Sequence, residues 1–338
     1  MNKQLKTALQ LIVGIGIAAA LLYLTFRDSS LEELAGLKET NFFWVGMGGF
    51  AMFGMYIFRA LRWGLMLDRA GHPAKFFHLL LATLITYLVN SLTPKLGEIL
   101  RCTVLLKTDK VPVATSLGTV VSERVADVLV LLLGVSTIFL MELDRLGNLF
   151  GMMWEKVVGG IDPATLGLVG VIGLVLMGLG IYFLRSKRFS GGLIGKAQTF
   201  VKSMLEAAKS VLSLEKPWLF AFHTLMLWVC LVFAYYFFML GLPETEHLGL
   251  YMAILLLFIG GIGWALPVPG GMGTTHFIIW QLFLAFNLPE AAGKNIGILS
   301  NGATLAYNVI FGMIAWLIFL GLSYRMDQAE KNVALPEN

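Results

Sequence analysis

The chain has 338 residues, of which 57% are hydrophobic and only 14% are charged, and its mean hydropathy is +0.79. A soluble globular domain carries about 25% charged and about 45–50% apolar residues, so the composition excludes an ordinary water-soluble protein. The 25 Lys and Arg residues exceed the 21 Asp and Glu residues and give a net charge of +4. In a membrane protein such an excess belongs to cytoplasmic loops, so it does not indicate binding to nucleic acid.

Six apolar runs are long enough to cross the hydrocarbon core of a bilayer, which takes roughly 17–25 residues as a helix. In chain order they are residues 5–26, 42–58, 113–141, 164–184, 218–240 and 295–323. The first run is longer than the apolar core of a signal peptide, so we expect it to remain as a membrane span. These runs predict an all-α polytopic membrane protein with about six transmembrane helices.

Two further apolar stretches are interrupted by proline and glycine. Residues 77–105 break at Pro94, and the arm after the break contains Arg101 and is too short to span. We therefore expect a re-entrant hairpin, which returns to the side from which it entered. Residues 249–288 break at the cluster Pro267–Gly273, and their longer arms allow either a hairpin or two full spans.

The positive charges favour a topology with both termini in the cytoplasm, because most Lys and Arg residues then lie in cytoplasmic segments. These segments are residues 1–4, 59–76, 95–112, 185–217 and 324–338, with Lys6 counted in the first. Residues 193–214 carry apolar side chains at helical spacing, which predicts an amphipathic helix on the lipid headgroups. A helix packed on another cytoplasmic loop fits that pattern equally well.

The predicted topology contains an internal repeat. We take residues 1–338 as one membrane domain, with a first half at 1–163, a second half at 164–324 and a short cytoplasmic tail at 325–338. Each half consists of two spans, a hairpin and a third span. Because three spans bring the chain to the opposite side of the membrane, the second half has the inverted orientation. Inverted repeats whose broken helices meet near the bilayer midplane are common in transporters.

A charged group interrupts the run of residues 113–141. Its members are Glu123, Arg124 and Asp127, and Glu123 lies about 15 Å into the helix at 1.5 Å per residue. Each charge costs roughly 2.5–3.5 kcal/mol at the centre of a membrane helix, so these side chains must face an interior and find partners. A buried ion pair that fixes helix packing would satisfy this requirement. A polar substrate path or a proton relay would also satisfy it, and charges within the membrane favour this functional interpretation.

A second charged group surrounds the first break. Thr93 followed by proline is a good helix start. The arm after the break would then point its N-terminal amides into the membrane, where they favour an anion such as phosphate. Lys95 and Arg101 add positive charge, and Glu98 could pair with Arg101 or with Arg124. The alternative is that Lys95, Glu98 and Arg101 only lie at the cytoplasmic interface.

The second break offers backbone amides through Gly270, Gly271 and Gly273, whose small size permits a tight turn and the close approach of a ligand. His276 follows and could carry protons, although packing is the more common role of such a histidine. The two cysteines and the other histidines have no metal-ligand spacing. The sequence also lacks the signatures of zinc hydrolases, serine hydrolases and phosphate-binding loops, so we expect neither an enzyme nor a cofactor or metal.

Three groups of residues together resemble the transmembrane-domain family of the lysylphosphatidylglycerol synthases, also called flippase-like proteins. They are Thr93-Pro94-x-x-Gly97-Glu98-x-x-Arg101, Glu123-Arg124-x-x-Asp127 and Pro267-x-Pro269-Gly270-Gly271-x-Gly273. The first two are the more specific part of the resemblance. Family members often carry a glutamate shortly after the glycines, where this chain has Thr274-Thr275-His276.

The resemblance implies a domain of the bacterial or archaeal cytoplasmic membrane that moves lipids between leaflets, including aminoacylated phosphatidylglycerol. The founding members add a soluble aminoacyl-transferase domain, whereas this chain ends at Asn338, so we expect no lysyl transfer. We expect a flippase or transporter for a phosphate-bearing lipid of the anionic phospholipid or polyprenyl-phosphate type. The alternative is a membrane-embedded scaffold or partner subunit of a glycosyltransferase or lipid-modifying enzyme.

Overall fold

In the computed structural model the described residues form helices and the turns between them, and no strand occurs among them. The structure describes residues 19, 22, 23, 25, 26, 33–93, 96–143, 214–265 and 268–334. The predicted spans 5–26 and 164–184 and the predicted amphipathic helix 193–214 lie wholly or mainly outside these residues. The all-α fold expected from the sequence is confirmed.

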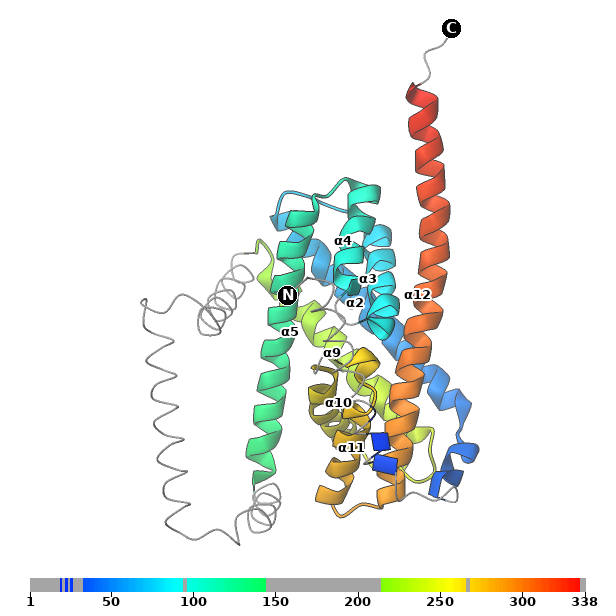
Figure 1. The fold of residues 1–338 in the computed structure, drawn as a ribbon. Helices are drawn as coiled ribbons and strands as arrows, with labels where there is room; N and C mark the ends of the chain where they lie inside the picture. Colours follow the sequence, from blue (N-terminus) through cyan, green and yellow to red (C-terminus); the bar gives the residue numbers. More distant parts are fainter. Residues whose placement is uncertain are drawn as a thin grey trace, which may run out of the picture. The chain divides into compact units, whose positions relative to one another are not determined.

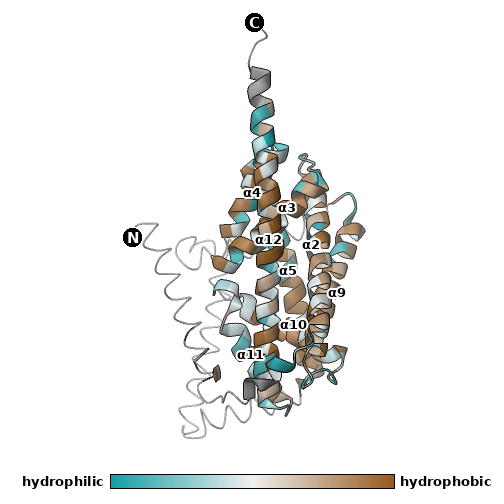
Figure 2. Ribbon diagram, turned by 90° about the vertical axis from the view of Figure 1, so that its right-hand side faces the viewer, coloured by the Kyte–Doolittle hydropathy of each residue, from teal (hydrophilic) through white to brown (hydrophobic). Residues whose placement is uncertain are grey.

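The described residues contain eight α-helices and two 3-10 turns. The helices are α2 (Phe42–Arg69), α3 (Phe76–Leu92), α4 (Leu96–Asp109), α5 (Val113–Met141), α9 (Pro217–Leu240), α10 (Leu250–Ala265), α11 (Thr274–Ala285) and α12 (Glu290–Ala334), and the turns are η1 (Glu33–Glu39) and η2 (Pro269–Gly271). Four of them, α2, α5, α9 and α12, are long and apolar enough to cross a membrane. Figure 2 shows α12 apolar through its middle turns and polar towards its C-terminal end.

The chain divides into two compact units. The first comprises Met1–Glu123 and Leu214–Asn338, and the second comprises Arg124–Ser213, so that α5 begins in the first unit and continues in the second. Within the first unit α2 packs against α9 and α3, and α3 packs against α4 and α12 (Figure 1). In the same unit α11 packs against α10 and α12.

Both interrupted stretches form helical hairpins. The arms α3 and α4 pack against each other, as do α10 and α11. The second pair has 16 and 12 residues. These arms are therefore about 24 and 18 Å long, shorter than the hydrocarbon core of about 30 Å, which favours a hairpin over two full spans. The turn η2 also contacts α3, so the tip of the second hairpin reaches the first.

The helix α2 is longer than the sequence predicted. The expected end of the second span at residue 58 is wrong, because α2 continues to Arg69. Its additional turns carry Arg59 and Arg62, whose exposed fractions are only 5% and 0%. These two arginines therefore lie inside the protein and not in a cytoplasmic loop. The helix α12 likewise extends beyond the predicted range of residues 295–323 at both ends.

Candidate functional site

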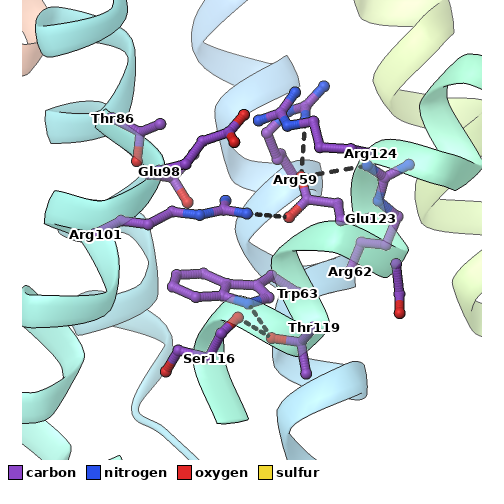
Figure 3. A network of polar contacts seen from close by, with 12 residues as sticks. Arg59, Arg62, Trp63, Thr86, Glu98, Arg101, Ser116, Thr119, Glu123 and Arg124 are labelled. Atoms are coloured by element: carbon purple, nitrogen blue, oxygen red, sulfur yellow. Dashed lines mark hydrogen bonds and ion pairs between the residues drawn. The ribbon is translucent and has the colours of Figure 1, made fainter. Parts of the chain in front are cut away.

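Three arginines converge on one carboxylate within the first unit. Arg59 and Arg62 come from α2, Arg101 from α4 and Glu123 from α5 (Figure 3). Arg59 Nη1 donates to Glu123 Oε1 at 2.7 Å, and Arg101 Nη2 donates to Oε2 at 2.8 Å. Arg62 Nη2 approaches Oε1 at 3.4 Å. We call these four residues the arginine cluster.

The arginine cluster is closed off from solvent. Glu123, Arg62 and Arg101 have an exposed fraction of 0%. Electrostatic interactions are strong in such surroundings, and a buried charge that is not compensated costs several kcal/mol. Three guanidinium groups and one carboxylate have a formal net charge of +2. The four residues of the cluster are therefore electropositive together, and the half-buried carboxylate of Glu98 beside them offsets part of this charge.

Each guanidinium group of the cluster also lies over an aromatic ring. The distances from guanidinium carbon to ring centroid are 4.3 Å for Arg101 and Trp63, 5.5 Å for Arg62 and Phe220, and 5.7 Å for Arg59 and Tyr87. The face of an aromatic ring attracts a cation, by about 2 kcal/mol or more where water is excluded. The rings thus offset part of the excess positive charge without adding a carboxylate.

The ring beneath Arg101 is held in place by α5. Trp63 is fully buried, and its Nε1 donates to Thr119 Oγ1 at 2.9 Å. The Thr119 hydroxyl in turn donates to the Ser116 carbonyl at 2.8 Å. This contact between α2 and α5 orients the indole ring against the Arg101 guanidinium (Figure 3).

Glu98, a predicted site residue, lies beside the arginine cluster. It stands three residues before Arg101 and therefore on the same face of α4. Its side chain is half-buried, and Figure 3 shows its carboxylate directed towards the arginines. Lys95, the other predicted charge of this hairpin, lies outside the described residues.

The tip of the first hairpin differs from the predicted anion site. Thr93 is the C-cap of α3, because its amide and hydroxyl donate to the Val89 carbonyl at 2.8 and 3.1 Å. The Gly97 amide, at the start of α4, donates to Asn90 Oδ1 at 3.0 Å. The expectation of free amides is thus wrong for Gly97, and the positive charge near this hairpin comes from arginine side chains instead.

The predicted group of Glu123, Arg124 and Asp127 is divided between the two units. Glu123 is the last residue of the first unit and joins the arginine cluster. Arg124 and Asp127 belong to the second unit, where Arg124 Nη1 lies 3.6 Å from Asp127 Oδ2. Glu123 thus contacts arginines of α2 and α4, and Asp127, four residues further along α5, lies beside Arg124.

The second break is a glycine turn fastened by a histidine. Gly270, Gly271 and Gly273 have φ angles of 57°, 64° and 78°, a backbone conformation that favours glycine. His276 is 7% exposed, and its Nδ1 accepts from the Gly273 amide at 3.3 Å. Thr274 Oγ1 donates to the carbonyls of residue 263 in α10 and residue 271 in the turn. The histidine therefore has a structural contact within the hairpin tip.

Reasoning from the sequence did not identify Arg59 and Arg62 as site residues. Their signal was present, because two arginines three positions apart share a helix face and Trp63 follows them directly. Among the described residues, no group of three or more His, Cys, Asp or Glu side chains could hold a metal ion. The polar groups that converge in the arginine cluster are three guanidinium donors and one carboxylate.

A comparison with protein-family models matches residues 11–312 to the lysylphosphatidylglycerol synthase TM region. The matched range contains the arginine cluster and both hairpins. Comparisons with curated proteins and with solved structures gave no match. Because the family match covers most of the chain, the protein belongs to the lysylphosphatidylglycerol synthase transmembrane family.

Proposed function

We propose that the chain is a flippase or transporter that moves a phosphate-bearing lipid, or a lipid-linked precursor, between the leaflets of the cytoplasmic membrane. Membership of the family suggests a function related to membrane lipids. The observation that carries the proposal is the excess of positive charge in the arginine cluster. A phosphate group is the anion that a lipid bilayer supplies in quantity.

One arginine is enough to pair with a carboxylate in a structural ion pair. The cluster instead sets three guanidinium groups around Glu123 and supports each of them with an aromatic ring. Arginine binds phosphate oxygens through two parallel hydrogen bonds, which a lysine cannot do. The headgroup would reach these buried side chains in a conformation in which α4 and α5 have moved apart from α2.

The two hairpins support a transporter and not an enzyme. Both interrupted stretches are helical hairpins, and the tip of the second one contacts α3 of the first. We infer that they belong to two inverted halves, 1–163 and 164–324, with both termini in the cytoplasm. Broken helices that meet in this way form the substrate sites of many transporters.

Exchange of labelled lipids between leaflets of proteoliposomes tests the proposal. Phosphatidylglycerol, lysylphosphatidylglycerol and a polyprenyl phosphate would be compared with the wild-type protein and with Arg62→Gln. Arg69→Gln is the matched control, because Arg69 is an exposed arginine at the end of the same helix. We expect rapid exchange of at least one lipid, reduced about tenfold or more by Arg62→Gln and retained by the control.

Failure of folded wild-type protein to exchange any of these lipids would refute the proposal. That outcome would favour the alternative, a scaffold or partner subunit of a glycosyltransferase or lipid-modifying enzyme. In such a subunit the arginine cluster would serve helix packing alone, and lipid exchange would require the partner.

A further inference from the structure

A row of buried polar side chains runs along one face of α12. Lys294, Asn301 and Asn308 follow one another at seven-residue intervals, close to two helical turns, so they share a helix face. Their exposed fractions are 2%, 2% and 3%. At 1.5 Å per residue the row is about 21 Å long, which is most of the thickness of a hydrocarbon core. We call these three residues the α12 seam.

The α12 seam holds the broken ends of both hairpins. Asn301 Nδ2 donates to the carbonyl of Gly270, in the tip of the second hairpin, at 3.0 Å. Asn308 Nδ2 donates to the hydroxyl of Ser91, in the last turn of α3 before the first break, at 3.3 Å. Ser91, just before the first break, and Gly270, in the second, therefore meet the same face of α12, about 10 Å apart along its axis.

One end of the α12 seam is connected to the arginine cluster. The hydroxyl of Tyr56 donates to Asn308 Oδ1, and Tyr56 stands one turn before Arg59 on α2. The Tyr56 ring meets the edge of Tyr87 at 4.9 Å between centroids, and Tyr87 is the ring beneath Arg59. Polar and aromatic contacts thus continue from the cluster into the seam.

The other end of the seam repeats the chemistry of the cluster. Lys294 Nζ lies 2.8 Å from Glu290 Oε1 and 5.5 Å from the centroid of the Trp280 ring. As in the arginine cluster, a cation lies over an aromatic ring and beside a carboxylate, but here the ratio of cation to carboxylate is one to one. A phosphate that leaves the arginine cluster would therefore meet a second cationic contact at the far end of α12.

Two buried hydroxyls lie next to the middle of the seam. Ser300 and Thr275 have exposed fractions of 0%, and neither side-chain oxygen has a hydrogen-bond partner within the part of the chain that the structure describes. Ser300 precedes Asn301, and Thr275 Oγ1 lies against Gly271, next to the carbonyl that Asn301 binds. Buried hydroxyls without partners are unfavourable, and a polar headgroup in this position would satisfy them.

We propose that the α12 seam is one wall of the route by which the headgroup crosses the membrane, with Lys294 as its second phosphate contact. The inference rests on the proposed lipid transport and adds the path that the headgroup takes through the protein. In this structure the hydrogen bonds of Asn301 to Gly270 and of Asn308 to Ser91 close the route. During passage, hydrogen bonds to the headgroup replace them one after the other.

Leucine variants of the seam test the route, because leucine branches at Cγ as asparagine does and has no polar group. Asn301→Leu and Asn308→Leu should each lower leaflet exchange about tenfold or more. Asn295→Leu is the matched control: Asn295 is fully buried on the same helix and donates its side-chain amide to Glu244 at 2.9 Å, but it lies about 120° around the axis from Asn301. This control should stay within about twofold of the wild type.

Lys294 provides a second, independent measurement should a leucine variant fail to fold. Lys294→Gln should lower exchange about tenfold, and Lys294→Arg should retain several times more exchange than the glutamine variant. If folded seam variants exchange lipid like the wild type while Arg62→Gln abolishes exchange, the route is refuted and the transport function stands. If the wild type exchanges none of the three lipids, the proposed function itself fails and the route fails with it.

Discussion

Replacing Glu123 by glutamine should destabilise the protein more than replacing any one of the three arginines around it. The Glu123→Gln variant loses the charge that attracts all three guanidinium groups and leaves them facing one another. An arginine-to-glutamine variant removes only one attraction, and it lowers the excess positive charge at the same time. The asymmetry follows from the ratio of three cations to one anion.

The magnitude follows from the geometry of the cluster. Glu123 accepts two short bonds, at 2.7 and 2.8 Å, and a longer one at 3.4 Å. A hydrogen bond to a charged group contributes about 1.5–3 kcal/mol, and removal of one partner of a buried pair costs about 3–5 kcal/mol. We expect Glu123→Gln to cost about 5 kcal/mol. Arg101→Gln should cost about 1–3 kcal/mol, because Glu123 keeps two other arginines.

Unfolding of the purified variants in detergent, followed by tryptophan fluorescence and checked by size-exclusion chromatography, measures these differences. Glu246→Gln is the control, because Glu246 is an exposed carboxylate between α9 and α10 of the same unit. An unfolding midpoint of Glu123→Gln within the range of the three single arginine variants would refute the reasoning. It would mean that Glu123 is not the main group that compensates the positive charge of the three arginines.

Gly97→Ala should destabilise the protein by about 1–3 kcal/mol, because a Cβ there would collide with the Thr86 carbonyl of α3. Gly118→Ala, in a part of α5 where no atom would lie within 4 Å of a Cβ, should instead be neutral or stabilise by about 0.5–1 kcal/mol. The midpoint of chemical unfolding distinguishes the two variants, and equal effects would contradict the close packing of α4 on α3. Lys107→Ala should cost less than about 1 kcal/mol, because its ion pair with Asp327 is partly open to solvent. The same unfolding assay at high salt should show an even smaller effect, and a large loss would argue against this assignment.

The helices that rest on apolar length alone were predictable from the sequence. The expected spans 113–141 and 218–240 agree with α5 and α9 to within one residue at each end. Both breaks also appear where proline and glycine interrupt the apolar runs. Length and hydropathy are sufficient here because every span must satisfy its backbone hydrogen bonds within a helix while it crosses the lipid interior.

The end of α2 and the partners of Glu123 were not predictable in this way. A hydropathy scale counts each arginine as polar whatever its partners are. The predicted apolar run of α2 therefore ends just before Arg59, the first of the two arginines. Whether these charges are tolerable depends on Glu123, which is 64 and 61 positions further along the chain. Only the packed structure shows that α2 and α5 bring them together.

The structural and the transport interpretations of the cluster can be distinguished at the arginines and not at the carboxylate. Loss of Glu123 damages the fold under both interpretations, so loss of lipid exchange in that variant would be uninformative. Arg62 has the longest contact with Glu123, at 3.4 Å, and its removal lowers the formal charge of the cluster from +2 to +1. Arg62→Gln also loses the contact with the Thr224 hydroxyl and the Phe220 ring, so it should cost about 1–3 kcal/mol, clearly less than Glu123→Gln, while phosphate attraction falls. A variant that stays folded under assay conditions but is inactive would mean that this arginine serves a ligand as well as the packing of the helices.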